Sequence, residues 1–291
     1  MRSIHTIRRF YLKLCMLETD KISKFFYLPG EYYVNFAEIY QLARYSGTIY
    51  SDKHPSHFLD HERVDLVSDC EVPFAVISNR QKIVVVFRGT DSIQNWMTNI
   101  EIRLANAGAL FPGRIHTGFF AAYLLLRARL FSILGDHLAI ASGQLDLAVC
   151  GHSLGGAIAH LLVADLLAAN NKDLANFDDK INGLYCVTFG SPRVGNKIFA
   201  RYLENNLEND HIFRFVNSND IVPRLPIVFG KYRHIGKPYF FDRNGQLHRQ
   251  ISIWSRIWNQ VVDRIWRQHF LAGISDHSMD KYLTLLEKQV L

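Results

Sequence analysis

The chain has 291 residues, of which 48% are hydrophobic and 21% charged, with only 18 glycines and 8 prolines. This composition excludes disorder as the main state, and it excludes collagen-like and low-complexity proteins. The formal net charge of +6 favours anionic surfaces, but no nucleic-acid-binding motif accompanies it, so we expect no nucleic-acid partner. The length predicts one large domain over residues 30–291, preceded by an N-terminal extension over residues 1–29.

The N-terminal segment 10–17 (FYLKLCML) is similar to a signal-peptide core, but Lys13 interrupts it and no small-residue cleavage site follows. We identify no run of about 18 apolar residues and therefore expect no membrane-spanning helix. The localisation stays unassigned between the cytoplasm, the membrane periphery and export by another route. The four cysteines are too few for a disulfide scaffold in a chain of this length, and Cys150 and Cys186 are expected to be buried free thiols.

Hydrophobic periodicity predicts helices and strands that alternate along the chain. The expected helices cover residues 30–46, with Gly47 as the stop, and 116–134, 153–169 and 196–207. The expected strands cover residues 72–78, 82–87, 145–150, 184–189 and 212–217, and the polar segment 51–63 is expected to be a loop. This alternation predicts a mostly parallel sheet with helices on both faces.

The motif Gly151-His152-Ser153-Leu154-Gly155 has the form G-x-S-x-G, which marks the nucleophile elbow of α/β-hydrolases. An apolar strand precedes it and a helix rich in Ala and Leu follows it, as the elbow requires. Glycines two positions before and after Ser153 remove the Cβ atoms where the backbones converge. The alternative interpretation is a serine that caps the helix of an ordinary turn.

A serine nucleophile needs an acid and a base, which follow it in this order in the α/β-hydrolase chain. The best acid is Asp220, just past the strand 212–217, at the edge of the sheet where sites form; an Asp that caps the turn before Pro223 is the alternative. Asp210 precedes the strand and so lies at the opposite edge, and Asp242 follows a shorter strand.

Five histidines follow Ser153 at distances that suit the base. His277 is preferred, because it lies in a loop that enters the last amphipathic helix, and His234 is second. Periodicity favours His277 only modestly over the others, which are His211, His234, His248 and His269.

Seven segments together resemble the class 3 lipases, the fungal-lipase-like branch of the α/β-hydrolases, over roughly residues 30–290. The segments are VVVFRGT (84–90), SIQNWMTNI (92–100), HTGFFAAY (116–123), GHSLGGA (151–157), TFGSPRVG (188–195), NDIVPRLP (219–226) and SDHSMDKY (275–282). The resemblance implies an α/β-hydrolase fold with a short helical lid, and a triad of Ser153, Asp220 and His277.

The resemblance also implies an oxyanion hole formed by the backbone N–H groups of Thr90 and Leu154. It places the lid at residues 92–100, with Ile93, Trp96 and Asn99 toward the substrate. Relatives carry an Asp at the position of Asn99, where it supports the oxyanion residue. Asn99 can still form a hydrogen bond with Thr90, but without the charge.

Residues 249–270 (RQISIWSRIWNQVVDRIWRQHF) predict an amphipathic helical insertion, about 249–271, with three of the chain's four tryptophans. Its apolar face is rich in Ile, Val and Trp, and its polar face carries arginine, as in helices that lie on anionic lipid. The alternative is a helix that docks its apolar face on the core.

The function predicted from these features is a serine carboxyl-ester hydrolase, a lipase acting on acylglycerols without a cofactor or metal. A phospholipase A1-type hydrolase is the alternative within the same chemistry, and a non-enzymatic lipid-binding scaffold is the alternative outside it. The expected partners are a lipid or ester substrate and an anionic membrane surface. The sequence leaves the oligomeric state open.

Overall fold

The structure is a computed structural model that describes residues 35–51, 58, 62–90, 102–108, 110–168, 174, 177–207, 211–218, 220–226, 230–236, 238–249 and 275–290. The predicted N-terminal extension, the predicted lid and the predicted amphipathic insertion after Arg249 lie outside the described residues. The domain boundaries and these two functional segments therefore stay predictions.

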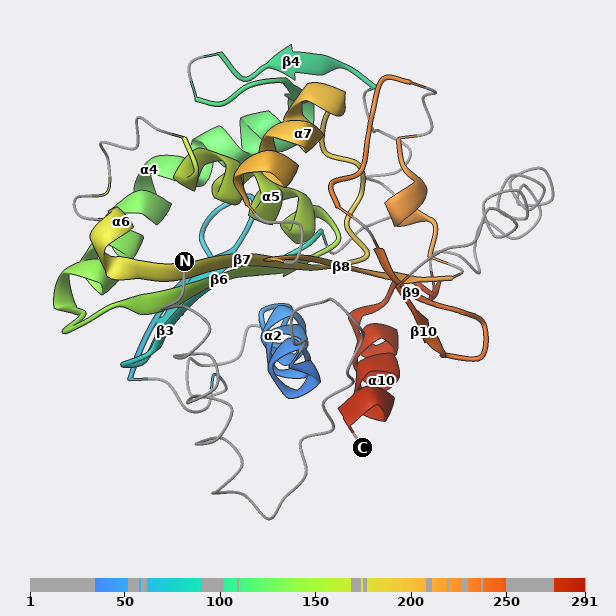
Figure 1. Ribbon diagram of the computed structural model, residues 1–291, viewed down its shortest axis with the longest axis horizontal. Coiled ribbons are helices and arrows are strands. Elements are labelled where there is room, and N and C mark those ends of the chain that lie inside the picture. The colour runs from blue at the N-terminus through green and yellow to red at the C-terminus, as the bar shows by residue number, and fades with distance from the viewer. Residues whose placement is uncertain are drawn as a thin grey trace, which may run out of the picture.

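An eight-stranded sheet forms the centre of the molecule (Figure 1), in the order β1-β2-β3-β6-β7-β8-β9-β10. The strand pairs from β3 to β9 are parallel, and those at the two edges are antiparallel. The strands are β1 (Arg63–Val67), β2 (Phe74–Ser78), β3 (Lys82–Phe87), β6 (Leu145–His152), β7 (Ile181–Phe189), β8 (Ile212–Asn217), β9 (Pro238–Phe241) and β10 (Leu247–His248). The predicted mostly parallel sheet is confirmed.

Helices cover both faces of this sheet, as predicted (Figure 1). On one face lie α4 (Thr117–Ile140), α5 (Leu154–Leu166) and α7 (Lys197–Asn206), and on the other lie α2 (Phe36–Thr48) and α10 (Met279–Val290). The shorter elements are β4 (Leu104–Asn106) and β5 (Arg114–His116), which pair with each other, α6 (Phe177–Lys180) and the 3₁₀ helix η3 (Val222–Arg224).

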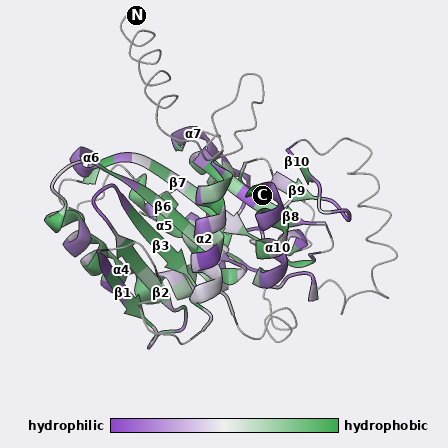
Figure 2. Cartoon of the chain, turned by 90° about the horizontal axis from the view of Figure 1, so that it is seen from below, coloured by the Kyte–Doolittle hydropathy of each residue, from purple (hydrophilic) through white to green (hydrophobic). Residues whose placement is uncertain are grey.

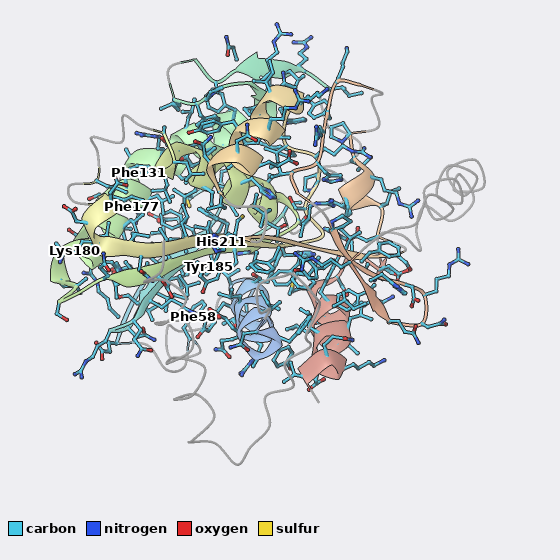
Figure 3. The ribbon with its side chains drawn as sticks, viewed as in Figure 1. Phe58, Phe131, Phe177, Lys180, Tyr185 and His211 are labelled. Atoms are coloured by element: carbon cyan, nitrogen blue, oxygen red, sulfur yellow. The ribbon has the colours of Figure 1, made fainter. Side chains whose placement is uncertain are left out.

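The strands divide their side chains between two hydrophobic layers, because successive residues of a strand point to opposite faces. In β3, Val85 and Phe87 belong to the layer under α4 and α5, whereas Val84 and Val86 belong to the layer under α2 and α10. Figure 3 shows the same division, with Phe131 on the α4 face and Tyr185 on the α2 face. The strands are therefore hydrophobic on both sides, and Figure 2 colours much of their length accordingly.

Two local features differ from the prediction. Gly47 does not end α2, which continues to Thr48. The strand β1 was not predicted, because its polar and partly exposed sequence RVDLV lies at the edge of the sheet.

Helix α4 also departs from expectation, because by length and mean hydropathy it could span a membrane. The prediction of no such helix was therefore too strict. In the fold, however, α4 packs side chains such as Phe119, Tyr123 and Leu130 into the layer above the sheet. This core position explains its buried apolar residues, whereas Leu125 and Ile140 on the same helix are exposed.

Helix α5 is buried over almost its whole length and carries His160, which is 2% exposed. Burial, together with the nearby charge of Arg214, lowers the pKa of His160 to about 3. His160 is therefore held neutral under conditions in which an unfolded chain would protonate it.

We expect acid to destabilise the protein through His160. Below its ordinary pKa the unfolded chain binds a proton that the folded chain does not bind, so stability falls as the pH falls toward 3. At pH 5 this difference amounts to roughly 2 kcal/mol. Between pH 7.5 and pH 5, the free energy of unfolding of His160→Leu should fall by about that much less than that of the wild type. Urea unfolding measures both. An identical loss in both proteins would contradict the assignment.

Candidate active site

Ser153 occupies a strained backbone position between the end of β6 and the start of α5. Its φ of 58° and ψ of −126° make it the one non-glycine residue with a positive φ in the part of the chain that the structure describes. Such conformations cost on the order of 1–3 kcal/mol and occur mainly at functional sites. The strand-turn-helix context predicted for the G-x-S-x-G motif is confirmed.

The two glycines of the motif permit close contact between backbones. A Cβ on Gly151 would lie 2.4 Å from the carbonyl carbon of Gly155, and a Cβ on Gly155 would lie 2.2 Å from the carbonyl oxygen of Phe87. The turn thus presses against its own helix and against the end of β3. Any larger residue at either position would push Ser153 away from these elements.

Asp220 and His277 meet at the carboxyl edge of the sheet. Asp220, just after β8, is fully buried, and its Oδ2 accepts a hydrogen bond from Nδ1 of His277 at 2.8 Å. The backbone N–H of Val222 donates to Oδ1 of the same carboxylate at 2.9 Å. A buried carboxylate with these donors holds the imidazole in one orientation, with Nε2 facing away from Asp220.

Tyr282 is a further member of this group that sequence reasoning missed. Its hydroxyl donates to Oδ2 of Asp220 at 2.6 Å and accepts from the backbone N–H of Asn217 at 3.0 Å. Burial and the charge of Asp220 raise the pKa of Tyr282 well above its ordinary value, so the phenol stays a donor. The segment SDHSMDKY contains Tyr282, but its link to Asp220 spans 62 residues and has no local pattern.

No hydrogen bond joins Ser153 and His277 in this structure. Ser153 Oγ and His277 Nε2 are both buried and both lack a partner among the described residues. The ring of His152, the residue before Ser153, lies 4.4 Å from the ring of His277, centroid to centroid. Nucleophile and base are commonly loose without substrate, so this geometry is compatible with a triad.

The other candidates for acid and base are engaged elsewhere, so far as the described residues show. His234 Nε2 binds the carbonyl of Pro223 at 2.6 Å, and His248 pairs with Asp242 at 2.8 Å on the surface. His211 begins the segment that enters β8, at the opposite end of that strand from Asp220. Asp210 and His269 lie outside the described residues.

The predicted oxyanion residues border Ser153 from two sides. Leu154 is the first residue of α5, where backbone N–H groups are not used by the helix. Gly89, which precedes Thr90, lies against the elbow, because a Cβ there would be 3.0 Å from Ser153 Cβ. The predicted lid residues Ile93, Trp96 and Asn99 lie outside the described residues.

No cluster of three His, Cys, Asp or Glu side chains that could hold a metal occurs in the described residues. The side chains gathered near the elbow supply a hydroxyl, an oriented imidazole and a carboxylate.

The family model described as lipase (class 3) matches residues 84–230, just over half of the chain. The chain belongs to the class 3 lipases. The match includes Ser153 and Asp220 and ends before His277. The fold agrees, since this class 3 lipase is similar to the triacylglyceride lipase of Rhizomucor miehei, with a TM-score of 0.60 and 26% identity over 72% of this chain and 82% of that one. The fold is that of the α/β-hydrolases.

Among curated proteins, this class 3 lipase is 35% identical over 175 residues to the secreted mono- and diacylglycerol lipase 1 of Fusarium solani, which covers 60% of this chain and 48% of that protein. It is 27% identical to a triacylglycerol lipase of Ricinus communis, over 78% of this chain and 56% of that protein. The chain thus spans about half the length of the curated relatives that it matches. One matched structure, with a TM-score of 0.59 and 26% identity, is described as a triacylglycerol lipase whose catalytic centre is a serine protease triad.

We expect Gly155→Ala to destabilise this class 3 lipase by about 3 kcal/mol or more, because the new Cβ would collide with the backbone of β3 rather than with a movable side chain. Urea unfolding measures the effect. Gly143→Ala is the matched control, since no atom lies within 4 Å of the Cβ position there. Equal stability of the two variants would show that the elbow tolerates the methyl group.

Proposed function

We propose that this class 3 lipase is a serine carboxyl-ester hydrolase that acts on acylglycerols. The observation that carries the proposal is the buried Asp220–His277 pair beside a serine held at a strained turn. A strained nucleophile needs a base that an acid orients, and these residue types supply that combination. The names of the relatives, which act on mono-, di- and triacylglycerols, support the substrate class.

In the proposed reaction, Ser153 Oγ attacks the ester carbonyl carbon while His277 Nε2 takes the hydroxyl proton. The N–H groups of Thr90 and Leu154 stabilise the negative oxygen of the tetrahedral intermediate. His277 then protonates the leaving glycerol oxygen, and a water molecule releases the fatty acid from Ser153 by the same steps. Asp220 stabilises the imidazolium form of His277 throughout.

Two peripheral elements of the proposal rest on the sequence. Residues 92–100, with Ile93, Trp96 and Asn99, are proposed to form the lid over the acyl-binding site. Residues 249–271 are proposed to bind an anionic membrane surface through their tryptophan-rich face. Opening of a lid controls access to the site and leaves the chemical step unchanged.

We expect a fluorophosphonate probe to label the wild-type protein covalently and Ser153→Ala not to be labelled. Gel fluorescence with intact-protein mass spectrometry measures this directly. Ser78→Ala is a matched control, because Ser78 Oγ also lies by a histidine, 2.7 Å from His137 Nδ1, but far from the elbow. Labelling that survives in Ser153→Ala, or no labelling of the wild type, would refute the proposal.

Fatty-acid release should favour acylglycerols over phospholipids. We expect emulsified mono-, di- and triacylglycerols to be cleaved at least roughly tenfold faster, in kcat/KM, than phosphatidylglycerol vesicles, which corresponds to about 1.4 kcal/mol of transition-state binding. Titration of released fatty acid at constant pH measures both. The reverse preference would favour the phospholipase A1 alternative, and the elbow chemistry would be unaffected.

A further inference from the structure

The residue before the nucleophile, His152, makes specific contacts on both of its ring nitrogens. Its Nε2 lies 2.6 Å from the backbone carbonyl oxygen of His277, and its Nδ1 lies 2.8 Å from the hydroxyl of Tyr50. The ring also packs on the ring of His277 at an interplanar angle of 30°. His152 thus touches both the backbone and the imidazole of the proposed base.

These partners determine the tautomer of His152. A carbonyl oxygen only accepts, so Nε2 must carry the proton and donate to His277. Burial, and then the nearby His277, lower the pKa of His152 well below its ordinary value, so Nδ1 is unprotonated. Tyr50 is therefore the donor to Nδ1, and its hydroxyl stabilises the tautomer that binds the His277 carbonyl.

Tyr50 reaches this position because Gly89, which precedes the predicted oxyanion residue Thr90, has no side chain. Tyr50 follows the end of α2, and a Cβ on Gly89 would lie 2.1 Å from its hydroxyl oxygen. The same Cβ would lie 2.7 Å from the carbonyl oxygen of His152. The side chain of Tyr50 therefore passes against the segment that holds Thr90 before it reaches His152.

We propose that His152 and Tyr50 are positioning residues for the base, which fix the loop of His277 to the elbow so that its Nε2 stays beside Ser153. The inference rests on the proposed function, since it concerns the same site. Asp220 and Tyr282 restrain the imidazole from one side through its Nδ1, and His152 restrains its backbone and one ring face from the other.

A neutral His152 also suits the charge that develops during the reaction. His277 becomes positive when it takes the serine proton, and a cationic ring stacked on it would oppose this step. The other titratable and charged groups around this pair, among the described residues, are Asp220, Tyr282 and Tyr50, with Arg88 over the ring of Tyr50 and Arg214 near Tyr282. A single carboxylate therefore faces the imidazole.

The test is Tyr50→Phe, which removes one hydroxyl and keeps the ring. On a soluble short-chain ester we expect kcat to fall about fivefold to tenfold, as for loss of one buried hydrogen bond, with KM changed less than twofold. The acid limb of the kcat/KM profile should move to lower pH, because a looser His277 loses part of its contact with Asp220. Tyr40→Phe, on helix α2 and packed against the same hydrophobic layer as Tyr50, is the matched control and should leave both values unchanged.

A second pair of variants tests His152 itself. His152→Leu should lower kcat about 100-fold, the size expected when a reacting group is displaced by about 1 Å. His152→Gln should recover most of that loss, because an amide N–H can still donate to the His277 carbonyl. Wild-type kcat and an unmoved acid limb in Tyr50→Phe, or no difference between the Gln and Leu variants, would overturn the proposal.

The result is distinguishable from failure of the proposed function. If the wild-type protein is labelled by fluorophosphonate but Tyr50→Phe reacts at the same rate, the positioning role alone fails. If the wild type is not labelled, solvent exchange of the His152 ring N–H, followed by NMR, still tests the contact, because Tyr50→Phe should speed this exchange relative to Tyr40→Phe. An unchanged exchange rate would overturn the proposal there as well.

Discussion

The site depends on the close approach of three backbones at one turn. β3, β6 and α5 meet where Gly155 contacts the end of β3, and this contact holds Ser153 at its positive φ. The strain is sustained because each of the three elements is buried and belongs to the central layers. A rigid sheet can hold a serine hydroxyl in a conformation that an isolated turn would leave.

The acid and the base are brought to this turn by elements far along the chain. Asp220 follows β8, two strands away from β6. His277 precedes α10, which covers the face of the sheet opposite to α5. Tyr282 joins these two elements, since it donates to Asp220 and accepts from the backbone at the end of β8. Because the carboxyl ends of parallel strands share one edge, the sheet topology brings Asp220 to the edge that holds Ser153, and the hydrogen bonds of Tyr282 and Asn217 bring the His277 segment there.

Local sequence signals predicted the centre of the fold. The residues that were not predicted are those whose roles depend on contacts with distant parts of the chain. The apolar run 82–87 is a strand with the expected bounds, and the elbow forms where Gly, Ser and a following helix predicted it. Asp220 and His277, which the structure pairs, could be proposed from the sequence because chain order and family motifs restrict the choice. Tyr282 and Tyr50 were not found, since their partners are 62 and 102 residues away and no local pattern marks them.

A second hydrogen-bonded set of Ser, His and Asp lies elsewhere in the fold, and comparison with it shows which features distinguish the proposed site. Ser78 Oγ lies 2.7 Å from His137 Nδ1, and His137 Nε2 lies 2.8 Å from Asp65, where β1, β2 and α4 meet. By distance alone this set is more complete than the proposed triad. Yet Ser78 is the last residue of an ordinary strand, its carbonyl pairs with Glu62, and Arg63 shares the carboxylate. No helix begins at Ser78 to offer N–H groups for an oxyanion. The strained turn, the helix start beside it and the histidine with an uncommitted Nε2 therefore distinguish the proposed site from a set that joins a helix to a sheet edge.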